Sequence, residues 1–367
     1  MKTGLLILLV LHGLIHLMGF TKAFGFAEMK QLTQYISRPA GVLWLAACLL
    51  FIIAAYLLWR KADMWWVVAI AAVVISQVVI VMDWKDARFG TIANVIIVAG
   101  IIMGAGVVGF KNSFLSEARN GLLQTPYFKD GLLTEEDLVS LPEPVKNYIR
   151  YTGCVGKHRV NRFKIIFHGA LRNNDQSTWM PLTSVQYNFM QEPTRLFFLN
   201  AVMKKLPVAG FHCYKNRKAY MDIRLLSLFK VQFQKGPDMD QSETVTFFND
   251  MCCMAPATLI DPRIEWLETD GLNVKAKFTN GHIAITATLY FNKTGELANF
   301  ISNDRYSTDE GKKLPWSTPL HDYRLINNHL LPGYAETIYT YPDRNFIYGK
   351  FSIEEITYNF DAISKTV

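Results

Sequence analysis

The hydrophobic residues near the start of the chain form long unbroken runs, and later they alternate with polar residues. Four early runs each approach the ~20 apolar residues that cross the hydrocarbon core of a bilayer. They occupy residues 4–20, 40–59, 65–84 and 91–110. Amphipathic rings prefer the headgroup level, and Trp59, Trp65 and Trp84 stand at the ends of these runs. The pattern predicts four transmembrane helices.

The alternation of period two begins near residue 160 and is clearest around Asn280–Gly281. Residues 274–278 and 283–291 alternate on either side of this pair, which predicts a hairpin with a type I′ turn. Short connections favour antiparallel pairing of consecutive strands. Further strand-like runs cover 164–171, 184–190, 196–202, 218–223, 228–234, 297–302, 321–326, 334–341 and 348–360.

These patterns predict two folding units joined by a short polar segment. We expect a four-span transmembrane domain at 1–110, a connector at 111–133 and a β-rich soluble domain at 134–367. The soluble part belongs to the α+β class. We expect its antiparallel sheet to curve like an incomplete barrel and to carry a few helices.

One strong helix interrupts the strands. Asp240 and Glu243 have the spacing of a capping box, and Pro256 ends the segment. Its apolar face includes Phe247, Met251 and Met254, and sulfur-rich faces adapt well to irregular partners. The face is expected to fill one side of the sheet as core, to line a ligand site, or to do both.

Composition narrows the classes of partner. The net charge is +7, but Lys and Arg are scattered without the basic run that tracks phosphates, so no nucleic acid is expected. The charge indicates either affinity for anionic lipid headgroups or ordinary solvated faces. Five cysteines without a CxxC pair imply neither a disulfide framework nor a metal site, and we predict no cofactor.

Polar residues in the apolar runs are expensive in a membrane and therefore informative. His12 and His16 share one helix face, and Asp83 borders the third run. The histidine pair has two readings. It presents imidazoles to a metal, a haem or a quinone, or it packs the bundle by hydrogen bonding to Ser76, Gln77 or Asn94.

Catalytic signals are weak, since the chain has no nucleophile elbow, P-loop or HExxH motif. The best polar constellation is formed by Asp304, Arg305, His321 and Asp322. It has two readings, acid–base chemistry on a lipid-like substrate or cross-strand ion pairing. The weakness of these signals favours a binding protein over an enzyme.

Three further features indicate apolar contacts. Trp179 and Met180 precede Pro181, and Trp316 opens a similar Trp-Pro turn, so these side chains are candidates to line a concavity or to clamp loops onto the sheet. Residues 201–211 form an apolar loop with two central lysines. That loop suits a membrane-facing or ligand-gating flap, and equally a buried connection.

Several phrases together resemble a bacterial membrane protein family of unknown function, some of whose members carry a four-helix unit before the soluble domain. One is the His-Gly-Leu-Ile-His opening within 11–20. The others are 141–148, 150–153, 179–181, 236–243, 304–306 and 316–323. The resemblance covers nearly the whole chain and implies no activity. In architecture, the soluble part distantly resembles the LolA/LolB lipoprotein-carrier fold, which shelters acyl chains.

The first functional hypothesis is a multi-pass protein of the bacterial inner membrane whose soluble domain binds a lipid or other hydrophobic ligand. Its partners are then the bilayer and that ligand. The alternatives are an enzyme using Asp304, Arg305, His321 and Asp322, and a redox or transport role at His12 and His16. Lys and Arg are balanced between the two sides of the bundle, so the side of the soluble domain stays open.

Overall fold

The computed structural model describes residues 2–125, 131–204, 206–307 and 310–364. The chain divides into two compact units, Met1–Phe110 and Lys111–Val367. The division falls within helix α6 (Gly90–Gln124), which contributes residues to both units.

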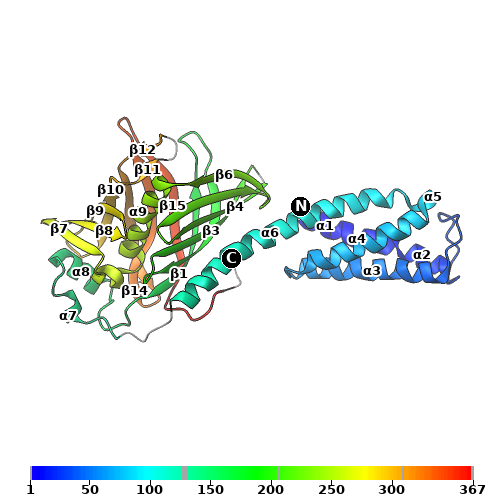
Figure 1. The fold of residues 1–367 in the computed structure, drawn as a ribbon, viewed down its shortest axis with the longest axis horizontal. Helices are drawn as coiled ribbons and strands as arrows, with labels where there is room; N and C mark the ends of the chain where they lie inside the picture. The colour runs from blue at the N-terminus through cyan, green and yellow to red at the C-terminus, as the bar shows by residue number, and fades with distance from the viewer. Residues whose placement is uncertain (1, 126–130, 205, 308–309, 365–367) are drawn as a thin grey trace. The chain divides into compact units, whose positions relative to one another are not determined.

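The first unit consists of helices (Figure 1). Among the described residues, four helical stretches are long and apolar enough to cross a membrane: Lys2–Ala23, Arg38–Trp59, Trp65–Met82 and Gly90–Gln124. The predicted four apolar helices are therefore present. The helices are α1 (Lys2–Ile15), α2 (Leu17–Ala23), α3 (Arg38–Trp59), α4 (Trp65–Met82), α5 (Trp84–Ala87) and the first part of α6.

Helix α6 extends beyond the fourth apolar run. Residues 111–124, expected to begin the connector, are helical, and residues 126–130 of that segment lie outside the described part of the chain. The helix persists because it has a buried face: Phe114 and Ala118 are fully buried, and the Phe114 ring lies 5.2 Å from that of Phe198 in the sheet. Aromatic burial therefore accounts for a helix in the part of the chain where the polar residues predict a connector.

The second unit is built on one large antiparallel sheet of 13 strands within the described residues, in the order β6-β5-β4-β3-β2-β1-β15-β14-β13-β10-β9-β8-β7. Its two edge strands, β6 and β7, do not pair, so the curved sheet stays open, as expected from the sequence. The strands are β1 (Arg162–Leu171), β2 (Met180–Phe189), β3 (Thr194–Met203), β4 (Leu206–Lys215), β5 (Lys218–Leu225), β6 (Phe229–Lys235), β7 (Ile264–Asp270), β8 (Asn273–Asn280), β9 (Ile283–Phe291), β10 (Leu297–Ser302), β13 (Trp316–Ile326), β14 (His329–Thr340) and β15 (Asn345–Tyr358).

Smaller elements complete the unit at the edges of the sheet (Figure 1). Helix α8 packs on the 3₁₀ turn η1 and on β8, and the Tyr148 hydroxyl donates to the Cys252 carbonyl oxygen at 2.9 Å. These elements are α7 (Glu135–Leu138), α8 (Glu143–Tyr151), η1 (Pro256–Ile260) and a short ribbon of β11 (Tyr306–Ser307) with β12 (Lys312–Lys313).

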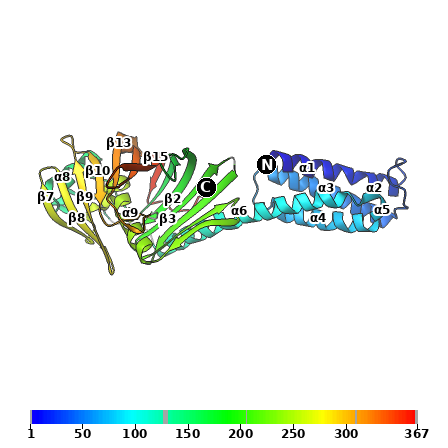
Figure 2. The same ribbon diagram turned by 90° about the horizontal axis from the view of Figure 1, so that it is seen from above.

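Helix α9 (Pro237–Met254) lies inside the curve of the sheet, between one arm that holds β7 to β10 and another that holds β2 and β3 (Figure 2). Every residue from 242 to 253 is buried, because the sheet surrounds the helix on several sides. Phe248 stacks on Phe278 of β8 with ring centroids 5.3 Å apart. The helix is therefore core, one of the two roles expected of it.

The predicted capping box of α9 is wrong. The helix begins after Gly236, and no side chain of the described residues caps it. Asp240 instead accepts from the Ala219 backbone amide at 2.7 Å, and Glu243 pairs with Arg195 at 3.1 Å. Both carboxylates join the helix to neighbouring strands, so tertiary contacts have taken the place of local capping.

Two predictions about the connections between strands also need correction. Residues 201–211 form the β3–β4 hairpin instead of a loop; Lys204 has a φ of 48° there, and Lys205 lies outside the described residues. In the β8–β9 hairpin, Asn280 pairs with Ile283, so the loop is Gly281–His282. Of these two residues only Gly281 has a positive φ, which excludes the type I′ turn.

Candidate functional site

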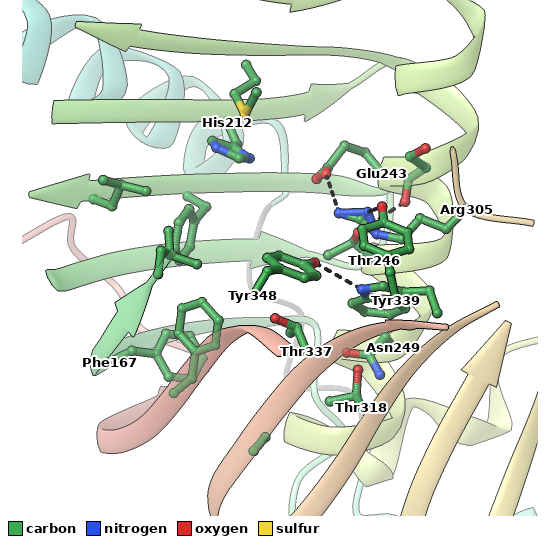
Figure 3. Close-up of a pocket in the computed structure, with 18 of the residues that line it drawn as sticks. Phe167, His212, Glu243, Thr246, Asn249, Arg305, Thr318, Thr337, Tyr339 and Tyr348 are labelled. Atoms are coloured by element: carbon green, nitrogen blue, oxygen red, sulfur yellow. Dashed lines mark hydrogen bonds and ion pairs between the residues drawn. The ribbon is translucent and has the colours of Figure 1, made fainter. Parts of the chain in front are cut away.

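A cavity of about 880 Å³ lies in the second unit, between α9 and the concave face of the sheet (Figure 3). Its volume is within the range of small-molecule sites, ~300–1,000 Å³. The lining comes from β1 to β6, from α9, from the segment at 305–307 and from β13 to β15. Strand periodicity explains this: every second side chain of each strand points to the concave face.

One part of the cavity is apolar. Phe167 of β1, Phe197 and Leu199 of β3, and Phe351 and Ile353 of β15 lie along it. The Phe351 ring contacts those of Phe167 and Phe197, at centroid distances of 5.7 and 6.4 Å. Binding of an apolar ligand against such a wall of aromatic and aliphatic groups is favourable, because it displaces water from apolar surface.

A buried charged cluster lies where α9 meets β2 and β3. Arg195 donates from Nε to Asp250 at 2.8 Å, from Nη1 to Glu243 at 3.1 Å and from Nη2 to Gln186 at 2.9 Å. Asp250 also accepts from Gln186 at 2.7 Å and from Asn188 at 3.0 Å. Because these hydrogen-bonding groups satisfy one another, the cluster holds α9 onto the sheet.

Burial shifts the acids and the base near this cluster in different directions. Burial alone would raise the pKa of Glu243, but the positive charges of Arg195 and Arg305 hold it below the ordinary value. For Asp250 burial prevails over Arg195, and the pKa is raised. Burial lowers the pKa of His212, which lines the cavity, to about 4, so the imidazole is neutral at pH 7.

Arg305 enters the cavity from the segment that follows β10. Its guanidinium lies 4.8 Å from the centre of the Trp316 ring and donates to the Tyr339 hydroxyl at 3.3 Å. Glu243 is 3.8 Å away, at the limit of an ion pair. Arg305 Nε has no hydrogen-bond partner among the described residues.

Two threonines follow the aromatic residues along β13 and β14. The register pairs Trp316 with Tyr339, which places Thr318 opposite Thr337 two residues further along. Both threonines line the cavity, and both Oγ1 atoms lack a partner within the described part of the chain. In Figure 3 they lie beside Asn249 of α9, whose side-chain amide donates to the Cys253 sulfur at 3.4 Å.

The six ligand-binding candidates divide into three groups. Met180, Met254 and Trp316 line the cavity. Phe247 and Met251 are fully buried core residues of α9 and do not line it. They point away because a helix that is buried on all sides turns only one of its faces toward the cavity.

The sixth candidate, Trp179, lies outside the cavity lining and is half-buried. The guanidinium of Arg172 and the ammonium of Lys350 approach its ring, at 4.7 and 4.8 Å from the centroid. This side chain therefore clamps the β1–β2 connection onto the sheet, the second of the two roles expected for it.

The four catalytic candidates do not converge. Arg305 alone lines the cavity, while His321 and Asp322 are exposed. Asp304 accepts from the Thr286 amide at 2.8 Å and pairs with Lys313 at 3.2 Å. The reason is strand alternation: Trp316, Thr318 and Leu320 of β13 face inward, and this sends His321 to the outer face.

The polar residues of the first unit form a hydrogen-bonded network. His12 Nε2 lies 3.0 Å from Asn94 Oδ1, and His16 Nε2 lies 2.9 Å from Ser76 Oγ. His16 Nδ1 is 2.7 Å from the His12 carbonyl oxygen. These contacts match the packing role considered for the pair, and no group of three metal-ligating side chains occurs among the described residues.

Asp83, the third polar candidate in this unit, is buried at the end of α4. Its Oδ2 accepts from the indole Nε1 of Trp44 at 3.2 Å. The contact ties α4 to α3 and leaves Asp83 with a structural partner.

Sequence reasoning does not identify Arg195, Asp250, Thr318 or Thr337 as site residues. Arg195 and Asp250 are far apart along the chain and meet only through the fold. The threonines fit ordinary strand positions, and their one signal is that they share the inward alternation of Trp316.

A comparison with known protein families gives a match within the second unit. Residues 131–351 match a family of unknown function, DUF6544. No curated protein matches the chain.

Three solved structures are distantly similar, and their similarity concerns the fold alone. A Vibrio parahaemolyticus domain described as one of outer membrane lipoprotein sorting has a TM-score of 0.35 at 8% identity, covering 55% of this chain and 87% of its own. A LolA superfamily protein from Nitrosomonas europaea has a TM-score of 0.34 at 7% identity, covering 59% and 92%. A DUF1329 family protein from Desulfovibrio piger has a TM-score of 0.34 at 8% identity, covering 60% and 93%.

Proposed function

We propose that this chain, which belongs to the family of unknown function DUF6544, is a membrane-anchored protein that binds a lipid or other hydrophobic ligand in the cavity beneath α9. The observation that carries the proposal is a cavity of about 880 Å³ with an aromatic and aliphatic wall. Water in such a space makes few hydrogen bonds, so its displacement by an apolar ligand is favourable.

The four apolar helices support the anchoring half of the proposal. Each is long enough to cross a bilayer, and His12, Ser76 and Asn94 satisfy one another within the bundle, as buried polar groups in lipid must. We infer a multi-pass anchor in the bacterial inner membrane. The bilayer is then both the support of the ligand-binding unit and a source of hydrophobic ligands.

No observation favours the two alternative functions. The enzyme hypothesis needs Asp304, Arg305, His321 and Asp322 around one substrate, but of these four only Arg305 lines the cavity, and His321 and Asp322 are exposed. The redox hypothesis needs open ligand positions on His12 and His16, and both imidazoles are hydrogen-bonded to side chains of other helices.

The test is saturable uptake of a fluorescent hydrophobic probe, diphenylhexatriene, by the intact, delipidated protein held in amphipol. We expect one saturable site in the wild type. Ala201→Phe should weaken binding at least tenfold, because Ala201 lines the cavity and a phenyl ring there occupies space that the ligand needs. Ala284→Phe is the matched control, because Ala284 is exposed on β9 and outside the lining.

Two outcomes would contradict the proposal. One is a wild type without saturable uptake of the probe. The other is probe binding that Ala201→Phe and Ala284→Phe weaken equally. Native mass spectrometry of the untreated protein in mild detergent adds an independent readout, since a co-purified ligand appears as a discrete added mass.

A further inference from the structure

The polar atoms of the cavity are arranged in order along two adjacent strands. The Arg305 guanidinium lies over the row formed by Trp316 and Tyr339. The next inward-facing row is Thr318 with Thr337, about 7 Å further along at the rise of a strand.

The third row is aliphatic, with Leu320 opposite Ala335. From there the lining passes to the aromatic wall, because Ala335 pairs with Phe351 of β15 and the Phe351 ring contacts that of Phe167. Figure 3 shows Phe167 in this wall. A cation, a pair of hydroxyls and an apolar wall therefore follow one another in this sequence. An amphiphile with a polar head and a hydrocarbon chain has the same order.

The threonine pair has unused hydrogen-bonding capacity. Thr318 is 4% exposed, and its Oγ1, like that of Thr337, has no partner among the described residues. A buried hydroxyl without a partner is destabilising. Valine has the same shape, suits a strand equally well and carries no such penalty. Hydroxyls at both positions are therefore explained if a ligand supplies the missing partner.

The charge at this end of the cavity favours an acceptor on the ligand. Arg195 is satisfied by Asp250, Glu243 and Gln186. Among the described residues, the Arg305 guanidinium has one ion-pair partner, Glu243 at 3.8 Å, and a hydrogen bond to Tyr339, and its Nε has no hydrogen-bond partner. The donors at this end of the cavity are therefore the Arg305 guanidinium and, in the next row, the two threonine hydroxyls. Carboxyl and ester oxygens are acceptors that such a set recognises.

We propose that the ligand is a single-headed acyl lipid whose carboxyl or ester oxygens lie at Thr318, Thr337 and Arg305, with its chain along Phe167 and Phe351. This inference rests on the proposed function, because it assumes that a hydrophobic ligand occupies the cavity. It adds the chemical class of the ligand and the direction in which it lies.

The experiment compares ligands that share a chain and differ in the head. Hexadecanoic acid, its glycerol monoester and hexadecane each displace diphenylhexatriene from intact protein in amphipol. Thr318→Val and Thr337→Val should each weaken the acid and the ester about fivefold to tenfold, the effect of losing one hydrogen bond. Binding of hexadecane should not change, and Thr183→Val, at an exposed position on β2, should alter nothing.

Arg305 distinguishes the two heads. Arg305→Gln should weaken the acid more than the ester, because the guanidinium interacts more strongly with an ionised carboxylate than with a neutral ester. The head that binds more tightly to the wild type is the one that the site favours. A melting temperature measured without ligand separates a binding role from a structural one. The valine variants should melt higher than the wild type, because an unpartnered hydroxyl has been removed.

Three results would overturn the inference. They are lower melting with equal weakening of all three ligands, hexadecane binding as tightly as the acid in the wild type, and valine variants that bind the acid and the ester as tightly as the wild type does. In each of these cases the probe still binds, so the proposed function stands. Failure of every hydrophobic compound to bind would instead remove both proposals.

Discussion

Arg195 of β3 and Asp250 of α9 form an ion pair with 2.8 Å between Nε and Oδ2, and both side chains are at least nine-tenths buried. This pair joins the helix to the sheet at the polar end of the cavity. Removing one partner leaves the other charge buried and uncompensated, which is more costly than the pair itself is stabilising.

We therefore expect Asp250→Ala to lower the free energy of unfolding of the second unit by about 3–5 kcal/mol. The control is Glu265→Ala, which removes the exposed pair with Lys277 at 2.9 Å and should cost less than about 1 kcal/mol. Urea unfolding of the intact protein, followed by far-UV circular dichroism, measures both. Equal effects of the two substitutions would show that the buried pair is no more important than a surface pair.

His212 predicts a dependence of stability on pH. Its pKa is lowered by burial to about 4 in the folded state, against an ordinary 6.5, so the unfolded chain binds the proton more readily between these values. Stability contributed by the neutral imidazole is thus complete above pH 6.5 and is lost as the pH falls to about 4. The loss should be about 1–3 kcal/mol, since each pKa unit corresponds to 1.36 kcal/mol and the cavity admits some solvent.

The measurement for His212 is urea unfolding across pH 4 to 7. His212→Gln should flatten the profile in this window, whereas His282→Gln, in the exposed β8–β9 loop, should keep the wild-type slope. An unchanged slope in His212→Gln would exclude the imidazole as the source. Any further loss at lower pH is expected from Glu243, whose pKa lies below its ordinary value.

Phe114 tests whether the end of α6 is part of the fold. Its ring is fully buried and lies 5.7, 5.2 and 5.5 Å from those of Tyr187, Phe198 and Phe211. Phe114→Ala should destabilise the second unit by about 3–5 kcal/mol, the usual cost of removing a core phenyl ring. Leu123→Ala is the control on the same helix, at 80% exposure. Thermal melting that treats both alike would contradict the packing described here.

Gly19 and Trp44 predict a close contact within the helical bundle. A Cβ on Gly19 would lie 2.1 Å from Trp44 Cδ2, so alanine forces α2 and α3 apart. We expect Gly19→Ala to destabilise the bundle by about 1–3 kcal/mol. Gly4→Ala should be neutral or slightly stabilising, since no atom of the described residues lies within 4 Å of an added Cβ and alanine favours the helix. Thermal denaturation in detergent compares the two, and equal melting would contradict the contact.

The sequence predicts the helices and strands of this fold better than it predicts which of them pair or pack together. Apolar runs and alternation depend on neighbours in the chain, so the four helices and most strands can be read directly. β4 is the instructive failure, because Pro207, Ala209 and Gly210 interrupt its pattern, although pairing with β3 and β5 makes it a strand. Local propensity does not include the hydrogen bonds that neighbouring strands provide.

The site was predictable only in part, for a related reason. Met180 and Trp316 are apolar strand residues whose inward position follows from alternation, and Met254 lies on the apolar helix that the sequence predicts. Glu243 shows the limit: its spacing from Asp240 fits a helix cap, and only the three-dimensional fold brings Arg195 within 3.1 Å. The threonine pair is less visible still, because the absence of a hydrogen-bond partner is a property of the folded chain.

The unpaired edges β6 and β7 affect which ligands the cavity can hold. In a closed barrel, strand number and shear set the diameter, so the interior has a fixed girth. An open sheet has no such constraint, since its two arms can spread by a change of twist while every interstrand hydrogen bond stays intact. We therefore expect chains that differ by several carbons to bind with similar affinity, and selectivity to depend on the head of the ligand more than on the length of its tail.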